Sequence, residues 1–431
     1  MLYSMNNIFA GMRSRDALLV IFAISILLIT LNGAYAWFLW NIHVGPFMLV
    51  NLFISLLYMI THKQQWFKLD LITAAFVFLV ATLFYNRGEY NPYGIIYAVG
   101  YMLPYYALAR SSLSVQRYVL NFILKILCFI LIPSMVLHVF FLAIGFPAIN
   151  PIAHEASDNY QFYNYFFLVH NYVMDNYQIR FCSIFLEPGY AGTLFVFLLY
   201  ANGMVLNGSR ENKILTLALL LTLSLAGYVI FTLAWIFTAL QKGFLKARYI
   251  LVLLFLVGSY FFAINYNGGD NVLYENIFSR LEIDDNGQLK GNNRNTGTAN
   301  DYFDFFLSNG QLWTGVGESG VSSINGGKGE YGTGSQDQIL GAGYVIYILK
   351  YGFISCILCF IGYFLFSLRN NIVYNMLFLI LIILTFWQAA YPLSGSWLIP
   401  YILGVNLNNK YSRKNSSPSR KAYSYSLIRL K

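Results

Sequence analysis

The sequence predicts an all-α integral membrane protein with about twelve transmembrane helices and two larger loops on one side of the membrane. Hydrophobic residues make up 58% of the chain and charged residues only 10%, whereas a soluble domain has about 25% charged residues. Apolar runs recur along the 431 residues, with lengths near the roughly 20 residues that cross hydrocarbon. These runs lack the residue-by-residue alternation of a membrane barrel. The spans are therefore expected to be helices.

The first run follows the basic residues of "GMRSRD", as in a signal peptide, and we interpret it as an uncleaved first span. Residues 214–241 are too long for one span, and the small residues of "SLAG" at 224–227 favour a tight turn between two short helices. The twelve predicted spans are 17–35, 38–61, 69–85, 94–109, 118–145, 190–206, 214–225, 227–241, 249–265, 341–366, 374–393 and 396–408.

The distribution of charge predicts which connections share a side of the membrane. With a cytoplasmic N-terminus, the inward connections, counted with Lys125, hold 20 Lys and Arg but 3 Asp and Glu, whereas the outward loops hold 6 and 15. Inward connections of membrane proteins are rich in Lys and Arg, so both termini are expected to be cytoplasmic. The net charge of +9 thus reflects topology and the anionic inner-membrane lipids beside the basic tail. It does not indicate a nucleic-acid partner.

This topology divides the chain into six parts, and the two outward loops are the only sizeable polar regions. The parts are helices 1–5 (1–145), a first outward loop (146–189), helices 6–9 (190–265), a large outward loop (266–340), helices 10–12 (341–408) and a basic cytoplasmic tail (409–431). No outward cluster has the ligand count of a metal site, so we expect activity without a metal or other cofactor. Functional residues are expected in the two outward loops.

The first outward loop ends in "RFCSIFLEPGYAG", which places two charged residues next to an apolar span. Proline suits the first turn of a helix, so Pro188 is expected to begin the span and Glu187 to lie at its N-terminus. Such a carboxylate is favoured by the helix dipole alone. An arginine beside a membrane-embedded helix is costly and usually pairs or binds a ligand. We therefore take Arg180 as a candidate phosphate-binding group and Glu187 as a candidate general base.

The large outward loop contains three further cations, Arg280, Lys290 and Arg294, each of which either is solvated or binds substrate. Its segment "NDYFDFFLSNGQLWTGVG" alternates aromatic and polar residues, which predicts a short amphipathic helix at the membrane surface. Trp313 in this segment either anchors at the interface or stacks on a sugar. The glycine-rich stretch that follows is expected to form a movable flap.

The segments "RFCSIFLEPGYAG", "LWTGVGESG" and "YVIYILKYGFI", in this order and topology, resemble the O-antigen polymerases and O-antigen ligases of bacterial inner membranes. The resemblance implies a polymerase that joins oligosaccharide units carried on undecaprenyl pyrophosphate at the periplasmic face, with a chain-length regulator as a further partner. In that family, arginines of two periplasmic loops precede a glycine by a fixed spacing. Arg280 and Gly291 fit that spacing, whereas Arg180 misses it by one residue.

The resemblance also implies roles for particular residues. Arg180 and Arg280 are expected to neutralise the departing pyrophosphate, and Glu187, with Asp337 as a second candidate, to deprotonate the acceptor hydroxyl. Arg294, Lys290 and Trp313 are candidate substrate contacts. Ligases usually carry a histidine near the end of the long loop, where this chain has Asp337, which disfavours an O-antigen ligase. The sequence also leaves open a transporter of lipid-linked sugars or a structural membrane protein.

Overall fold

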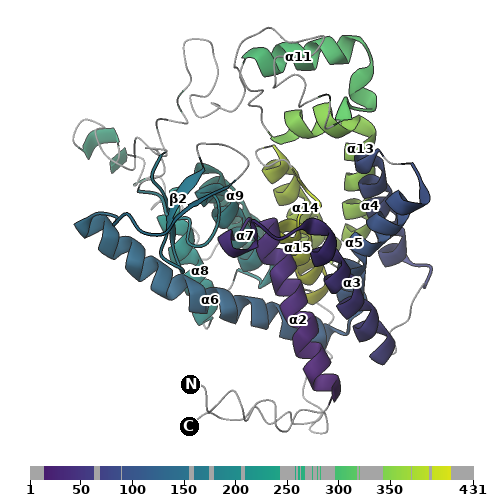
Figure 1. Cartoon of the computed structure of the whole chain (residues 1–431), viewed down its shortest axis with the longest axis horizontal. Helices are drawn as coiled ribbons and strands as arrows, with labels where there is room; N and C mark the ends of the chain where they lie inside the picture. The colour runs from purple at the N-terminus through teal and green to yellow at the C-terminus, as the bar shows by residue number, and fades with distance from the viewer. Residues whose placement is uncertain are drawn as a thin grey trace.

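The protein is mostly helical, and its apolar helices make it a membrane protein (Figure 1). The computed structural model describes residues 14–62, 68–88, 90–154, 160–173, 179–204, 209–242, 297–317, 343–369, 371–387 and 391–408, with a few isolated positions between 258 and 320. Within these residues, three helices are long and apolar enough to cross a membrane, and six further apolar helices are shorter.

The helices follow the predicted apolar runs closely, because long apolar segments in a membrane must satisfy their own backbone hydrogen bonds. Their bounds are α2 (Ser14–Gly33), α3 (Val44–Thr61), α4 (Leu71–Arg87), α5 (Pro92–Arg110), α6 (Leu113–Ile144), α7 (Pro188–Ala201), α8 (Arg210–Leu221), α9 (Leu225–Lys242), α11 (Gly297–Ser308), α13 (Gly343–Ser367), α14 (Ile372–Phe386) and α15 (Gly395–Leu407), with two 3-10 turns, η1 (Trp37–Leu39) and η6 (Gln311–Trp313). The three described helices that are long and apolar enough to cross a membrane are α3, α6 and α13.

Helices α7 and α15 form the centre of the bundle. Every residue of α15 is buried, as is every residue of α7 from Ala191 onward. Small residues allow the closest approaches, as is usual between membrane helices. A Cβ atom at Gly395 would lie 2.3 Å from the carbonyl oxygen of Ile29 in α2, and one at Gly404 would lie 3.1 Å from the Cα atom of Ala201 in α7. Helix α15 therefore packs closely against both α2 and α7.

The long run 214–241 is divided into two helices as predicted, but the break lies at 222–224, slightly before the turn predicted at 224–227. Helix α8 ends at Leu221 and α9 begins at Leu225, with Leu223 in the left-handed region at a φ of 46°. The predicted span 249–265 and the basic tail 409–431 lie outside the described residues, apart from five positions of the span.

The all-α prediction is wrong in one region, since the first outward loop contains a small antiparallel sheet. Its strands are β1 (Pro151–Ala153), β2 (Gln161–Asn164) and β3 (Val169–Asn171), in the order β1-β2-β3. Phe162 and Val169 of this sheet pack with Cys182 and Leu186 in a separate hydrophobic cluster. Strands of three or four residues have little stability alone, so this cluster is what holds the sheet.

Connections predicted to face the cytoplasm lie together on one side. Arg110 at the end of α5 forms an ion pair of 2.7 Å with Asp70, which caps the start of α4. Arg369, after α13, donates a hydrogen bond to Asn406 near the end of α15. Burial tends to raise the pKa of Asp70, but hydrogen bonds from Arg110 and from the start of α4 outweigh it, so this pKa lies below its usual value.

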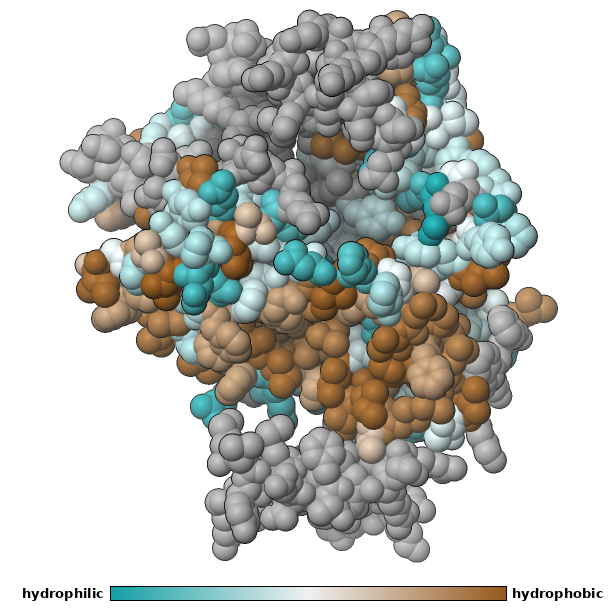
Figure 2. All heavy atoms as spheres, viewed as in Figure 1, coloured by the Kyte–Doolittle hydropathy of each residue, from teal (hydrophilic) through white to brown (hydrophobic). Residues whose placement is uncertain are grey.

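On the opposite side of the bundle, the start of α15 contacts the end of α2, and the turn after α2 contacts the first outward loop. Ser394, before α15, donates to the carbonyl oxygen of Gly33 at 2.9 Å, and the backbone of Leu186 donates to that of Tyr35 at 3.1 Å. Hydrophobic side chains form a broad belt below a band of hydrophilic ones on the described surface (Figure 2). Such a belt is the surface expected to face lipid.

Candidate functional site

The segment from Arg180 to Glu187 is a buried strap rather than an exposed loop. Besides the bond from Leu186 to Tyr35, three backbone hydrogen bonds hold it to remote partners: Phe181 donates to Leu221 at 3.0 Å, Ser183 accepts from Val169 at 2.7 Å, and Ile184 accepts from Trp37 at 2.9 Å. All eight residues of the strap are buried. These contacts hold the strap between the sheet, the α2–η1 turn and the end of α8.

Glu187 lies where the sequence predicted, immediately before α7, which begins at Pro188. Its side chain is 9% exposed and accepts a hydrogen bond from the hydroxyl of Tyr160 through Oε1. The carboxylate does not cap the amides of α7, although it is the N-cap residue of this described helix. Glu187 is thus held by a tyrosine from the edge of β2, on the side of the bundle predicted to face outward.

Arg180, at the other end of the strap, is buried and donates a hydrogen bond to a remote turn. It is 9% exposed, and its Nε donates to the carbonyl oxygen of Thr222 at 3.3 Å, in the turn between α8 and α9. Its charge also acts on Cys182, as does that of Glu187: burial raises the pKa of this thiol to about 12, with Arg180 lowering it and Glu187 raising it. The two predicted charges therefore share one buried neighbourhood.

An aromatic cavity of about 310 Å³ lies near Glu187, which is not one of its lining residues. Its lining includes Tyr35, Trp40, His154 and Tyr190. The rings of Trp40 and His154 meet edge to face at 5.0 Å, and those of Tyr35 and Tyr190 lie 5.0 Å apart. Aromatic faces beside a carboxylate suit the apolar faces and hydroxyl groups of a sugar.

A second feature of the outer side is the docking of the "TGVG" turn onto a kink in α13. Gly315 and Gly352 have φ values of 76° and 79°, and a Cβ atom at either would lie 2.5–2.6 Å from backbone atoms of the other segment. Val316 donates to the carbonyl oxygen of Leu349 at 2.8 Å. Only glycine adopts this backbone without strain at such an approach. Two of the segments that carry the family resemblance therefore contact each other directly.

This docked turn forms one wall of a cavity of about 610 Å³ that contains two cations. The guanidinium of Arg87, at the end of α4, lies 4.1 Å from the ring centroid of Tyr97, and the ammonium of Lys350 lies 5.3 Å from that of Tyr351. The described residues that line this cavity contribute two positive charges and no negative one. Cations stacked on aromatic rings keep their charge, which can attract an anion.

A third cavity of about 230 Å³, which we call the joining cavity, shares lining residues with both. Tyr391 lines all three, Tyr101 lines the aromatic and joining cavities, and Tyr97 lines the joining and cationic cavities. Charges from both ends of this row of cavities act on the hydroxyl of Tyr35. Burial raises the pKa of Tyr35, the charge of Glu187 raises it further, and Lys350 lowers it. Two cations thus line these adjoining cavities, which we together call the outer cavity, and the carboxylate of Glu187 acts on the lining residue Tyr35 without lining the space itself.

Four predicted site residues, Arg280, Lys290, Arg294 and Asp337, lie outside the described residues. Trp313 is described: it is 57% exposed, in η6, and its ring lies 5.7 Å from that of Phe353 in α13. The predicted surface helix is present as α11, and its Phe306 is buried against α13 with Leu312 of η6. Trp313 therefore packs outside the outer cavity as the described residues define it.

The sequence-based prediction missed Arg87 and Lys350. Lys350 is the only charged residue of the predicted span 341–366, and a lone charge within a membrane helix usually marks function. Arg87 lies two residues after the predicted span 69–85, at the end predicted to face outward. The same rule makes it a functional candidate. Nothing in the sequence shows that they meet, because the docking of the turn on α13 brings them together. Comparisons with protein-family models, with curated proteins and with solved structures each found no match to this chain.

Proposed function

We propose that the protein is a polysaccharide polymerase of the bacterial inner membrane, which transfers a growing glycan from undecaprenyl pyrophosphate to an incoming lipid-linked unit at the periplasmic face. The observation that carries this proposal is the outer cavity, which two cations line at one end and whose lining residue Tyr35 feels the charge of Glu187 at the other. The resemblance of three segments to O-antigen polymerases supports the substrate class. A chain-length regulator remains a proposed partner.

The chemistry follows from these two ends. A hydroxyl oxygen of the acceptor sugar forms a bond to the anomeric carbon of the growing chain, while the bond from that carbon to the pyrophosphate oxygen breaks. Glu187 takes the hydroxyl proton. The leaving pyrophosphate keeps the bonding electron pair, and Arg87 and Lys350 stabilise its charge. Arg280 and Asp337 keep their predicted roles, neutralisation and a second base, as contributions from the large loop.

The lipid tails of both substrates also require a place. An apolar groove of about 330 Å³ lies between α2 and α3 and is lined by Ile21, Ile24 and Val50, all exposed on the surface expected to face lipid. It shares Phe47 and Asn51 with the joining part of the outer cavity. An isoprenoid chain in this groove would keep its pyrophosphate at the cavity without leaving the membrane.

The surface polysaccharide of a deletion strain tests the proposed function. Cells with the chain are expected to give a ladder of polymer lengths on a gel, whereas cells without it carry single repeat units on their surface lipid. Two other outcomes contradict the proposal. Loss of every unit from the surface indicates a transporter, and polymer that forms but stays unattached to its surface lipid indicates a ligase.

A further inference from the structure

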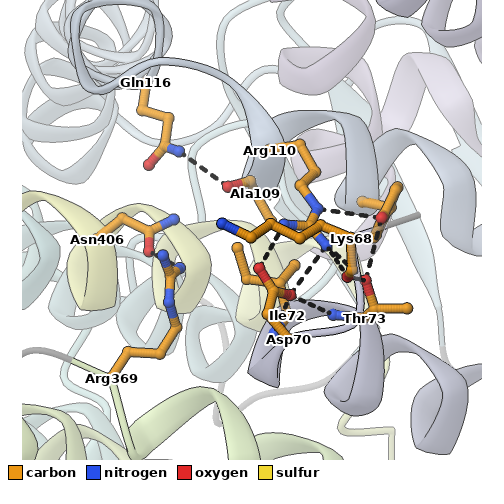
Figure 3. A network of polar contacts seen from close by, with 10 residues as sticks. Lys68, Asp70, Ile72, Thr73, Ala109, Arg110, Gln116, Arg369 and Asn406 are labelled. Carbon is orange, nitrogen blue, oxygen red and sulfur yellow. Dashed lines mark hydrogen bonds and ion pairs between the residues drawn. The ribbon is translucent and has the colours of Figure 1, made fainter. Parts of the chain in front are cut away.

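A second charged cluster lies on the opposite side of the bundle, at the face predicted to be cytoplasmic, and the proposed reaction does not use it. One part of this cluster is an ion pair with no net charge. The guanidinium of Arg110 holds both carboxylate oxygens of Asp70, at 2.7 and 2.9 Å, and also donates to the carbonyl oxygen of Lys68 and the hydroxyl of Tyr106 (Figure 3). This bidentate pair joins the start of α4 to the end of α5.

Beside this pair, the cluster has an excess of positive charge. Lys68, Arg110 and Arg369 contribute three cations, whereas Asp70 is the one carboxylate of the described group (Figure 3). Burial lowers the pKa of Arg369, the charge of Asp70 raises it, and Arg110 lowers it again. The second arginine is thus close to the first, and the one carboxylate is already engaged. Two positive charges at this place lack a counter-charge from the described residues.

The same place holds a hydrogen-bond donor with no acceptor. Asn406 is 3% exposed, and its oxygen accepts from Arg369, but its amide nitrogen has no partner in the described part of the chain. A buried amide without a partner is unfavourable by about 1–3 kcal/mol. In Figure 3 the side chain of Lys68 is directed toward the side on which Arg369 and Asn406 lie. The described groups there therefore offer donors in excess of acceptors.

We propose that Lys68, Arg369 and the amide of Asn406 bind one phosphate-bearing anion at this face. Arg369 and Asn406 donate to its oxygens, and Lys68 supplies charge. All three lie at or near helix ends, where the surface of a bilayer presents phosphate groups, and basic pockets between helices on this side suit anionic headgroups. The two sources of this chemistry are the headgroup of an anionic phospholipid and free phosphate. The inference does not depend on the polymerase function.

The test uses the full chain, purified in a neutral detergent, and three probes: dihexanoyl phosphatidylglycerol, dihexanoyl phosphatidylcholine and inorganic phosphate. The dose dependence of Tm gives the affinity for each probe. We expect Lys68→Gln and Arg369→Gln each to weaken binding of the anionic probe about fivefold, the effect of one cation near an anionic surface. Lys213→Gln is the matched control, since Lys213 is exposed on the same predicted face outside the cluster.

Each outcome is decisive. Stabilisation by phosphatidylglycerol but not by inorganic phosphate, reduced in both cluster variants, identifies a lipid headgroup; the same pattern with inorganic phosphate identifies free phosphate. The proposal is overturned if neither anion raises Tm, if both cluster variants bind as the parent does, or if Lys213→Gln loses as much affinity. Lys68 is exposed, and its ammonium makes no hydrogen bond or ion pair with the described residues. The Lys68→Gln variant is therefore expected to fold, and it remains informative if Arg369→Gln folds poorly.

Discussion

Glu187→Gln is expected to lower the rate of glycan transfer by about 100- to 10,000-fold, the usual contribution of a positioned general base. Glutamine has nearly the same shape and can still accept the hydrogen bond of Tyr160, but it cannot take a proton from the acceptor. The fold should therefore survive while the chemistry is lost. The measurement is the rate of chain extension in membranes that contain equal amounts of each variant, with Tm as the check on folding.

Two matched variants separate this role from general effects of the charge. Glu211→Gln removes a carboxylate from the first turn of α8, which is remote from the outer cavity, and should leave extension unchanged. Tyr160→Phe removes the hydroxyl that holds Glu187 and should slow extension less than the loss of the base. Normal extension by Glu187→Gln would refute the assignment of the base.

The double variant Arg87→Gln with Lys350→Gln is expected to have the second largest effect. Removal of one preorganised donor to a developing negative charge slows an enzyme by about 100- to 1,000-fold, and two cations face the same cavity. Each single variant should lower kcat strongly, and the double variant should also lose affinity for polyprenyl pyrophosphate. Extension and binding are measured on the same membranes.

Arg210→Gln serves as the control for this pair, because Arg210 is exposed at the start of α8, on the face predicted to be cytoplasmic. Since Arg87 stacks on Tyr97, a Tm measurement distinguishes a loss of packing from a loss of charge. Parental kcat and parental affinity in a well-folded double variant would show that the leaving group is held elsewhere, for which Arg280 is the predicted candidate.

Local features of the site were predictable from sequence. Pro188 set the start of α7, and with it the position of Glu187, because proline at a first helical turn acts through its own ring and missing N–H. Small residues also predicted a break within 214–241, although the break between α8 and α9 lies at 222–224 and most of the predicted turn is in α9. The apolar runs gave most helix bounds, since length and hydrophobicity are properties of a single segment.

Features that depend on remote contacts were not predictable. The sheet is held by packing of Phe162 and Val169 on the strap, and no pattern within three-residue strands shows that partner. The Nε atom of Arg180 donates to Thr222 in a turn far along the chain, and no local pattern around Arg180 shows that partner. The turn that contains Gly315 packs on the kink at Gly352 and forms one wall of the cationic cavity. Neither glycine, considered alone in the sequence, indicates this contact.

A reaction with the purified protein in liposomes tests whether the outer cavity joins lipid-pyrophosphate-linked glycans. Undecaprenyl-pyrophosphate-linked repeat units are the only sugar substrate supplied. We expect a ladder of lipid-linked oligomers, with one undecaprenyl pyrophosphate released for each bond formed, and no ladder from Glu187→Gln. Folded parent protein that leaves these units as single repeats, or a variant that makes the same ladder as the parent, would contradict this expectation.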